Sequence, residues 1–258
     1  MDKIIAIYGP TTSDKLGLAL NFSKYIFGKY QIDSEVINVD SRKIYKEFKI
    51  SQSLPIKEFL KKIKTDLFGT VSAKEELDLF EFQKMVKEKI AITQQRGDLP
   101  ILVGGSALHL LSILQSWEKG EKKQKRELPR NIFVFGVIIN KLRLKEAVTK
   151  NVSQMFKNGL YKEFKELYKM SKRKEISLDL LKKTLGYRQF LEMADVSKKS
   201  PLDLNTADLS KIEKWTIKDI LGYAYRQTLD YKRFSGIHLV KDFKEAKKII
   251  DLCFENHG

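Results

Sequence analysis

The most constraining feature of this sequence is a short turn, residues 9–15, that links an apolar run to a segment with apolar residues at helical spacing. The apolar run, residues 4–8, is typical of a strand that is covered on both faces. A turn between such a strand and a helix offers backbone N–H groups and the positive end of the helix to an anion, and Lys15 can reach phosphate oxygens from its end. The turn therefore predicts an α/β protein that handles phosphate or diphosphate groups.

The turn departs from the full phosphate-loop pattern, G-x-x-x-x-G-K-[ST], at two of its four fixed positions. Gly9 and Lys15 are kept, but Asp14 and Leu16 stand where the pattern has a glycine and a hydroxyl residue. Leu16 cannot supply the hydroxyl that ligates Mg²⁺, and a carboxylate at Asp14 weakens anion binding. Mg²⁺ is therefore a possible cofactor, but the loss of this hydroxyl argues against it. The turn alone is also compatible with an ordinary strand-turn-helix junction that carries a surface lysine.

The first half of the chain alternates between strand and helix patterns. Strands are predicted at residues 4–8, 35–39, 99–103 and 131–139. Helices are predicted at residues 16–27, with Gly28 as the cap, and at residues 77–96. This alternation favours a parallel sheet with crossover helices, in which ligands bind at the carboxyl ends of the strands. Asp40 and Ser106 both stand at such ends.

Two parts follow from this pattern. Residues 1–140 predict a P-loop-type α/β core, a three-layer parallel sheet with helices on both faces. Residues 141–258 predict a helical C-terminal part that packs on the core. Residues 118–130 are charged and poor in apolar side chains, so they predict an exposed connection.

The chain is strongly basic, with 49 Lys and Arg against 33 Asp and Glu and a formal net charge of +16. Such an excess attracts polyanions such as nucleic acids, although a lysine-rich genome explains it equally well. The single cysteine, Cys253, excludes an internal disulfide and a cysteine-rich zinc site. The sequence shows no signal-peptide pattern and no apolar run near the ~20 residues of a membrane span. We therefore expect a cytoplasmic monomer with no membrane partner.

Three segments of the first half read GPTTSDKLGLAL, VINVDSRKIY and LPILVGGSALHLLSIL. They resemble segments of the tRNA dimethylallyltransferase family, also called tRNA isopentenyltransferases, which read approximately GPTASGKT, ISADSMQVY and LPILVGGTGLY. Residues 151–167, 183–193 and 223–234 are similar to three later family segments, RVDxMxxxGLxxEVxxL, AIGYKE and YAKRQxTWFR. Order and spacing agree over most of the chain.

The resemblance implies transfer of a dimethylallyl group from dimethylallyl diphosphate to N6 of an adenosine next to the tRNA anticodon. The implied partners are thus tRNA and dimethylallyl diphosphate. Asp40 would accept the amine proton and Ser106 would contact the diphosphate, because the reaction needs a proton acceptor and donors to the departing charge. The implied diphosphate-binding residues are Gly9, Thr11, Thr12, Ser13 and Lys15. The implied tRNA-binding residues are Ser41, Arg226, Gln227, Lys232 and Arg233.

These assignments have structural alternatives. Asp40 and Ser106 both stand where a strand leads toward a helix, so either could be a helix cap. The helix that carries Arg226 could be a solvated basic helix rather than a tRNA contact.

Several family features are missing from the chain. Ile220 and Leu221 replace a Thr-Arg pair whose arginine helps the family grip the diphosphate. A helical insertion that helps the family hold the anticodon stem shrinks to roughly residues 117–130. We therefore expect the activity to be reduced or lost. Two alternatives stay open, a non-catalytic tRNA- or RNA-binding descendant and a prenyltransferase that acts on free adenine nucleotides.

Overall fold

The described strands form one parallel sheet in the order β3-β2-β4-β1-β5-β6. The computed structural model of the chain describes residues 3–54, 61–115, 128–234 and 236–255. Its strands are β1 (Ile4–Tyr8), β2 (Ser34–Asn38), β3 (Lys64–Asp66), β4 (Leu99–Gly104), β5 (Ile132–Val137) and β6 (His238–Val240). Most of the predicted connection, residues 118–130, lies outside the described residues.

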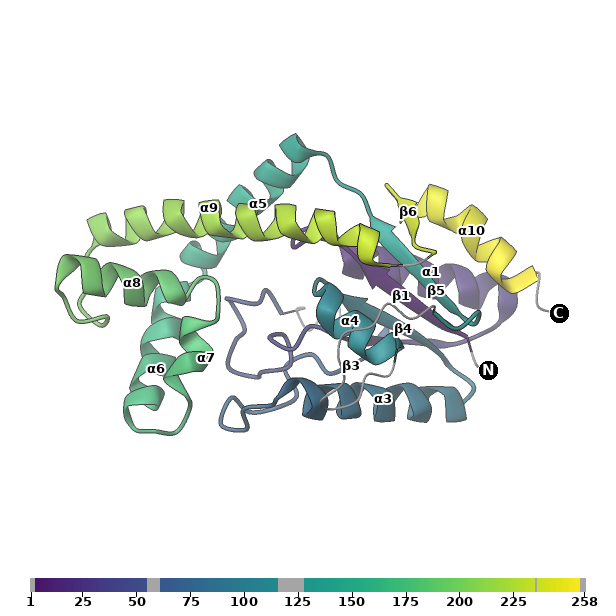
Figure 1. The fold of residues 1–258 in the computed structure, drawn as a ribbon, viewed down its shortest axis with the longest axis horizontal. Helices are drawn as coiled ribbons and strands as arrows, with labels where there is room; N and C mark the ends of the chain where they lie inside the picture. The colour runs from purple at the N-terminus through teal and green to yellow at the C-terminus, as the bar shows by residue number, and fades with distance from the viewer. Residues whose placement is uncertain (1–2, 55–60, 116–127, 235, 256–258) are drawn as a thin grey trace.

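Helices cover both faces of this sheet (Figure 1). They are α1 (Lys15–Tyr30), α3 (Leu79–Gln95), α4 (Ala107–Leu114) and α10 (Phe243–Glu255). Side chains alternate along each strand, so Ile5 and Ile7 of β1 pack with α1 and α10. Ala6 and Tyr8 belong to the core on the opposite face, which includes α3 and α4. The predicted three-layer parallel sheet is therefore confirmed.

A group of helices extends from one end of the sheet (Figure 1). Its elements are α5 (Lys141–Lys157), α6 (Leu160–Lys172), α7 (Leu178–Lys182), α8 (Arg188–Ser197), α9 (Thr206–Leu229) and the short 3-10 helix η1 (Asp230–Arg233). Val148 of α5 and Ile220 of α9 share one apolar cluster. The end of α9 reaches β1, where the Tyr8 hydroxyl donates a hydrogen bond to the Gln227 carbonyl at 2.8 Å. The helical part is thereby joined to the sheet.

Two strands and one helix end differ from the sequence predictions. β3 and β6 were missed because each has only three residues and is held by pairing with a neighbouring strand. β6 belongs to the C-terminal part, so the chain returns to the sheet after its helices. The helix predicted to stop at Gly28 continues to Tyr30, and Gln31 ends it in the left-handed conformation with φ 56°. None of the described helices combines the length and the apolar character that crossing a bilayer requires.

Candidate active site

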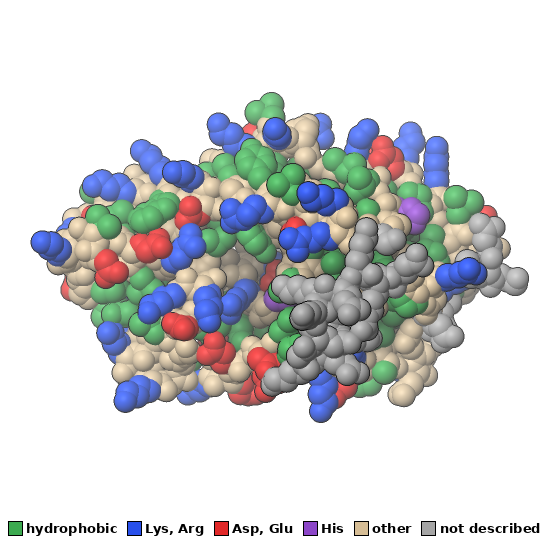
Figure 2. Space-filling model, viewed as in Figure 1, with side chains coloured by type: hydrophobic (Ala, Val, Ile, Leu, Met, Phe, Trp, Pro, Cys, Tyr) green, Lys and Arg blue, Asp and Glu red, His purple; other side chains and the backbone are tan. Residues whose placement is uncertain are grey.

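The sheet order brings three loops together at the carboxyl ends of the strands. Because β4 lies between β2 and β1, residues 9–14 after β1, residues 39–43 after β2 and residues 105–106 after β4 are neighbours. Residues of all three loops and of α9 line a cavity of about 550 Å³. Figure 2 shows a hollow below α9 in this face of the molecule, with Lys and Arg side chains around it.

The turn at residues 9–15, named the phosphate turn below for its sequence pattern, has a conformation that this pattern only partly suits. Asp14 is left-handed, with φ 47°, which glycine adopts readily and aspartate tolerates. The carboxylate of Asp14 accepts a hydrogen bond from the Gly17 N–H at 3.2 Å and so caps α1. Lys15 Nζ donates to the Pro10 carbonyl at 2.7 Å. A carboxylate of the protein therefore occupies the helix end that would otherwise attract a phosphate.

Two partly buried lysines, Lys15 and Lys43, line the cavity. Lys43 Nζ donates to the Gln52 carbonyl at 2.7 Å. Burial lowers the pKa of Lys15 to about 7, the charge of Lys43 adds to this effect, and Asp40 acts against it. Burial also lowers the pKa of Lys43, again against Asp40. An anionic ligand would favour the charged form of both lysines.

Asp40 and Ser106 line the same cavity, and each also has a local structural role. Asp40 Oδ1 accepts a hydrogen bond from the Arg42 N–H at 3.0 Å, within its own loop. Ser106 Oγ accepts from the His109 N–H at 3.3 Å and caps α4. A hydroxyl that accepts at a cap can still donate its own proton to a ligand. Capping and ligand contact are therefore compatible at Ser106.

The side chain of Gln227 faces the interior of the protein. It is buried, with 3% of the residue exposed. Its Oε1 accepts from the Thr11 N–H at 2.9 Å, and its Nε2 donates to the Gly105 carbonyl. A Cβ on Gly105 would lie 2.6 Å from this Nε2, so the close approach requires glycine. We therefore reassign Gln227 from a predicted tRNA contact to a residue that holds two loops of the cavity together.

The other predicted site residues divide between the cavity and its surroundings. Those that line the cavity are Thr11, Thr12, Ser13, Lys15, Asp40, Ser41, Ser106 and Arg226. Gly9 is buried, and a Cβ there would lie 2.7 Å from Ser13 Oγ. Lys232 and Arg233 are exposed on η1 and do not line the cavity. The side chain of Arg233 forms an ion pair with Asp230 at 2.6 Å.

Sequence reasoning missed several residues of the cavity. They include Lys43, His109, Arg188 and Tyr223. The Nδ1 atom of His109 is buried and has no hydrogen-bond partner among the described residues. Burial lowers the pKa of His109, so its imidazole is neutral at pH 7. Each of two missed residues stands three positions after a predicted site residue: Lys43 after Asp40, and His109 after Ser106. Residues at this spacing share a turn, so the spacing could have pointed to both.

The side chains here do not fit the usual Mg²⁺ site of a phosphate loop. Leu16 lines the cavity with an apolar side chain where that site has its hydroxyl ligand. In the described part of the chain, no group of three or more His, Cys, Asp or Glu side chains could hold a metal ion. The ammonium groups of Lys15 and Lys43 also oppose another cation nearby.

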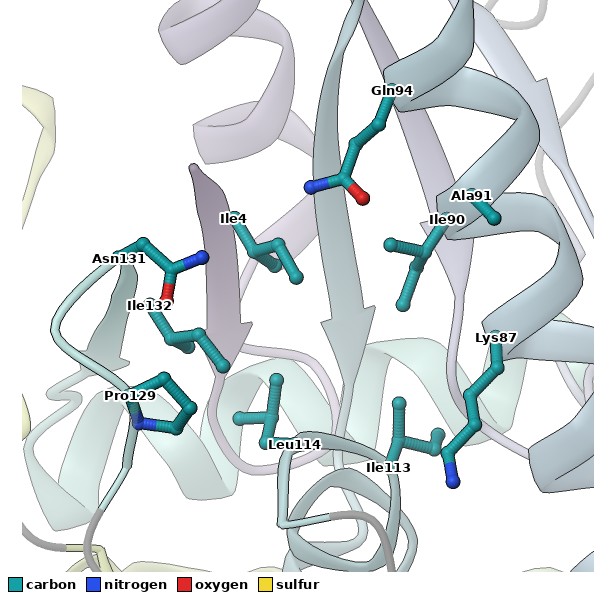
Figure 3. Close-up of a pocket in the computed structure, with 10 residues that line it drawn as sticks. All are labelled: Ile4, Lys87, Ile90, Ala91, Gln94, Ile113, Leu114, Pro129, Asn131 and Ile132. Carbon is teal, nitrogen blue, oxygen red and sulfur yellow. The ribbon is translucent and has the colours of Figure 1, made fainter. Parts of the chain in front are cut away.

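A second cavity, of about 440 Å³, lies near the amino ends of β1 and β5 (Figure 3). Its wall is largely apolar and includes Ile4, Ile90, Leu114 and Ile132. Lys87 is the one titratable side chain among its described lining residues. This cavity lacks the paired groups that proton transfer or diphosphate binding requires, so the first cavity is the candidate active site.

Comparison of the sequence with known proteins finds tRNA dimethylallyltransferases. A family model described as IPP transferase matches residues 43–131 and 115–232. The tRNA dimethylallyltransferase of Oenococcus oeni is 26% identical over 240 residues, which are 90% of this chain and 85% of that protein. The tRNA dimethylallyltransferase of Pelagibacter ubique is 36% identical over 117 residues, which are 45% of this chain and 36% of that protein. The phosphate turn lies outside the residues that the family model matches.

Solved structures share the fold at low sequence identity. The tRNA isopentenylpyrophosphate transferase of Bacillus halodurans superposes with a TM-score of 0.79 at 19% identity, covering 98% of this chain and 95% of that chain. A eukaryotic dimethylallyltransferase acting on tRNA superposes with a TM-score of 0.75 at 17% identity, covering 98% of this chain and 77% of that chain. The likeness covers the helical part as well as the sheet.

Proposed function

Because this chain belongs to the IPP transferase family, we propose that it transfers a dimethylallyl group from dimethylallyl diphosphate to N6 of an adenosine next to the tRNA anticodon. The observation that supports this proposal is the meeting of Lys15, Asp40 and Ser106 in one cavity. Six basic side chains and two carboxylates are among the residues that line it. This excess of positive charge suits a diphosphate, whose negative charge increases as it departs.

The proposed reaction is a displacement at C1 of the dimethylallyl group. N6 of the adenosine attacks C1, the bond from C1 to the diphosphate oxygen breaks, and its electron pair leaves with the diphosphate. The amine loses one proton, which the carboxylate of Asp40 accepts. Lys15, the hydroxyl of Ser106 and N–H groups of the turn stabilise the charge on the leaving diphosphate.

The basic side chains at and near the rim of the cavity favour an acceptor that carries several phosphates. Lys183 and Arg226 are exposed and line the cavity. Lys232 and Arg233 are exposed on η1, directly after the helix that carries Arg226, and do not line the cavity. Basic side chains on such a rim can hold a nucleic-acid backbone, whose contacts are largely ionic. A free adenine nucleotide inside the cavity would make no use of Lys232, which does not line it.

The direct test is to incubate the purified protein with dimethylallyl diphosphate and unmodified tRNA and to analyse the tRNA nucleosides by mass spectrometry. We expect prenylated adenosine at the position next to the anticodon. Asp40→Asn should lower the rate by roughly 10²- to 10⁴-fold, because the amide cannot accept the proton. Lys46→Gln is the control for variant preparation and for the loss of one surface charge, since Lys46 is exposed and does not line the cavity.

Two results would assign a different function. RNA binding that weakens steeply with salt, without any prenylated product, would indicate a non-catalytic RNA-binding protein. Product formed on free adenine nucleotides but absent from tRNA would indicate a small-molecule prenyltransferase.

A further inference from the structure

Lys43 is a cation of the cavity that the phosphate-loop pattern does not include. It lies in the loop after β2, and its Nζ donates to the carbonyl of Gln52, another lining residue, at 2.7 Å. Lys15 reaches the same cavity from the phosphate turn, where its Nζ donates to the Pro10 carbonyl. Two ammonium groups from different loops are thus held by backbone carbonyls beside one space.

Neither ammonium group forms an ion pair with a carboxylate among the residues that the structure describes. Arg188, on another wall of the cavity, differs in this respect because it is paired with Asp219 at 2.6 Å. A cation that is withdrawn from water is normally paired, since its charge is otherwise costly to bury. The unpaired charges of Lys15 and Lys43 therefore favour an anionic ligand between them.

The electrostatics of the two lysines agree with this arrangement. Burial, and then the charge of Lys43, lower the pKa of Lys15, and the charges of Asp40 and Asp14 act against them. The two ammonium groups are therefore close enough to disfavour each other. The same repulsion opposes a divalent cation in this space, where Leu16 also offers no ligand.

We propose that Lys43 and Lys15 together neutralise the diphosphate of the donor, so that donor binding requires no divalent cation. This inference rests on the proposed function, because it concerns the same diphosphate site. The ammonium of Lys43 supplies positive charge that a Mg²⁺ ion, held by a hydroxyl in place of Leu16, would otherwise bring to the site.

The experiment is calorimetric titration of the full chain with inorganic pyrophosphate, once in EDTA and once in Mg²⁺. We expect the Kd in EDTA to lie within about threefold of the Kd in Mg²⁺. Lys43→Gln should weaken binding in EDTA by about 10- to 100-fold, the usual effect of losing a hydrogen bond to a charged group. Lys43→Arg keeps the charge and should retain most of the affinity.

The matched control is Lys46→Gln, which makes the same charge change three residues away on an exposed side chain. It should alter the Kd by less than about twofold. Binding that requires Mg²⁺ in the wild type, or a Lys43→Gln variant that behaves like Lys46→Gln, would overturn the inference and leave the proposed function standing. If neither pyrophosphate nor dimethylallyl diphosphate binds in either buffer, the proposed function fails as well.

Discussion

The backbone N–H of Thr11 donates a hydrogen bond to the side-chain oxygen of Gln227 at 2.9 Å, although the two residues are 216 positions apart. The same amide group donates to the carbonyl of Gly105 through its nitrogen. One buried side chain on α9 thus connects the phosphate turn to the loop after β4. The helical part of the chain thereby helps to shape the cavity.

We expect Gln227→Leu to destabilise the protein by about 2 to 4 kcal/mol, because the partly buried N–H of Thr11 and the buried carbonyl of Gly105 both lose their partner. Urea unfolding measures this change, and pyrophosphate titration should show weaker binding. Gln154→Leu is the control on an exposed helix position, where a change within about 0.5 kcal/mol is expected. Equal effects of the two variants would contradict the bridging role of Gln227.

Asp14→Gly should tighten pyrophosphate binding by roughly threefold to tenfold, since it removes a carboxylate from the start of α1. The stability should change by no more than about 0.5 kcal/mol, because glycine suits the left-handed conformation and is a tolerable cap. Asp14→Ala separates the two effects. It should tighten binding similarly but cost about 1 kcal/mol or more in the free energy of unfolding. Unchanged binding in both variants would show that the Asp14 carboxylate does not compete with the ligand.

The lowered pKa of Lys15 makes the stability of the ligand-free protein depend on pH. Its folded-state pKa, about 7, lies below its ordinary value of 10.5, so the unfolded chain binds more protons between these values. The free energy of unfolding should therefore rise with pH from 7 to 8.5. Lys43 contributes with the same sign, because burial lowers its pKa too. Cys253 acts in the opposite direction only at higher pH, since burial raises its pKa to about 11.

Lys15→Met tests this dependence. At pH 7 we expect it to raise the free energy of unfolding by about 1 kcal/mol or more, since each pKa unit corresponds to about 1.4 kcal/mol. The gain should shrink as the pH rises to 8.5, and chemical denaturation across this range measures it. Saturating pyrophosphate should remove the pH dependence from the wild type, because the ligand restores the charged lysine. If the free energy of unfolding of the wild type were constant or fell from pH 7 to 8.5, the lowered pKa of Lys15 would be refuted.

Glu163 connects α6 to the loop that contributes Ser51 to the cavity. Its carboxylate accepts hydrogen bonds from the N–H groups of Ile50 and Ser51, at 2.8 and 3.0 Å, and from the Tyr187 hydroxyl at 2.6 Å. Glu163→Gln removes the charge and one acceptor oxygen, so we expect a loss of about 2 kcal/mol in a urea titration. Glu166→Gln, which affects an exposed pair with Lys169, should cost less than about 0.5 kcal/mol. A similar loss in both variants would rule out the specific role of Glu163.

Much of the site could be predicted from the sequence because its parts are local. An apolar run followed by a glycine turn and a lysine identifies the phosphate turn without any knowledge of its neighbours. Asp40 and Ser106 were found in the same way, at the ends of buried strands. Lys43 and His109 were not found, because a lysine in a loop and a histidine in a helix are common in any protein, and only the fold places them beside the cavity.

Apolar runs and turns are properties of neighbouring residues, so the sequence was enough to predict β1, β2 and β4 as buried strands with polar residues at their ends. The three-dimensional fold places β4 between β2 and β1, which makes the three loops adjacent. It also decided that Gln227 faces inward to Thr11 while Lys43 joins Lys15 in the cavity. Strand order and side-chain burial depend on which distant segments pack together, and no local pattern encodes that choice.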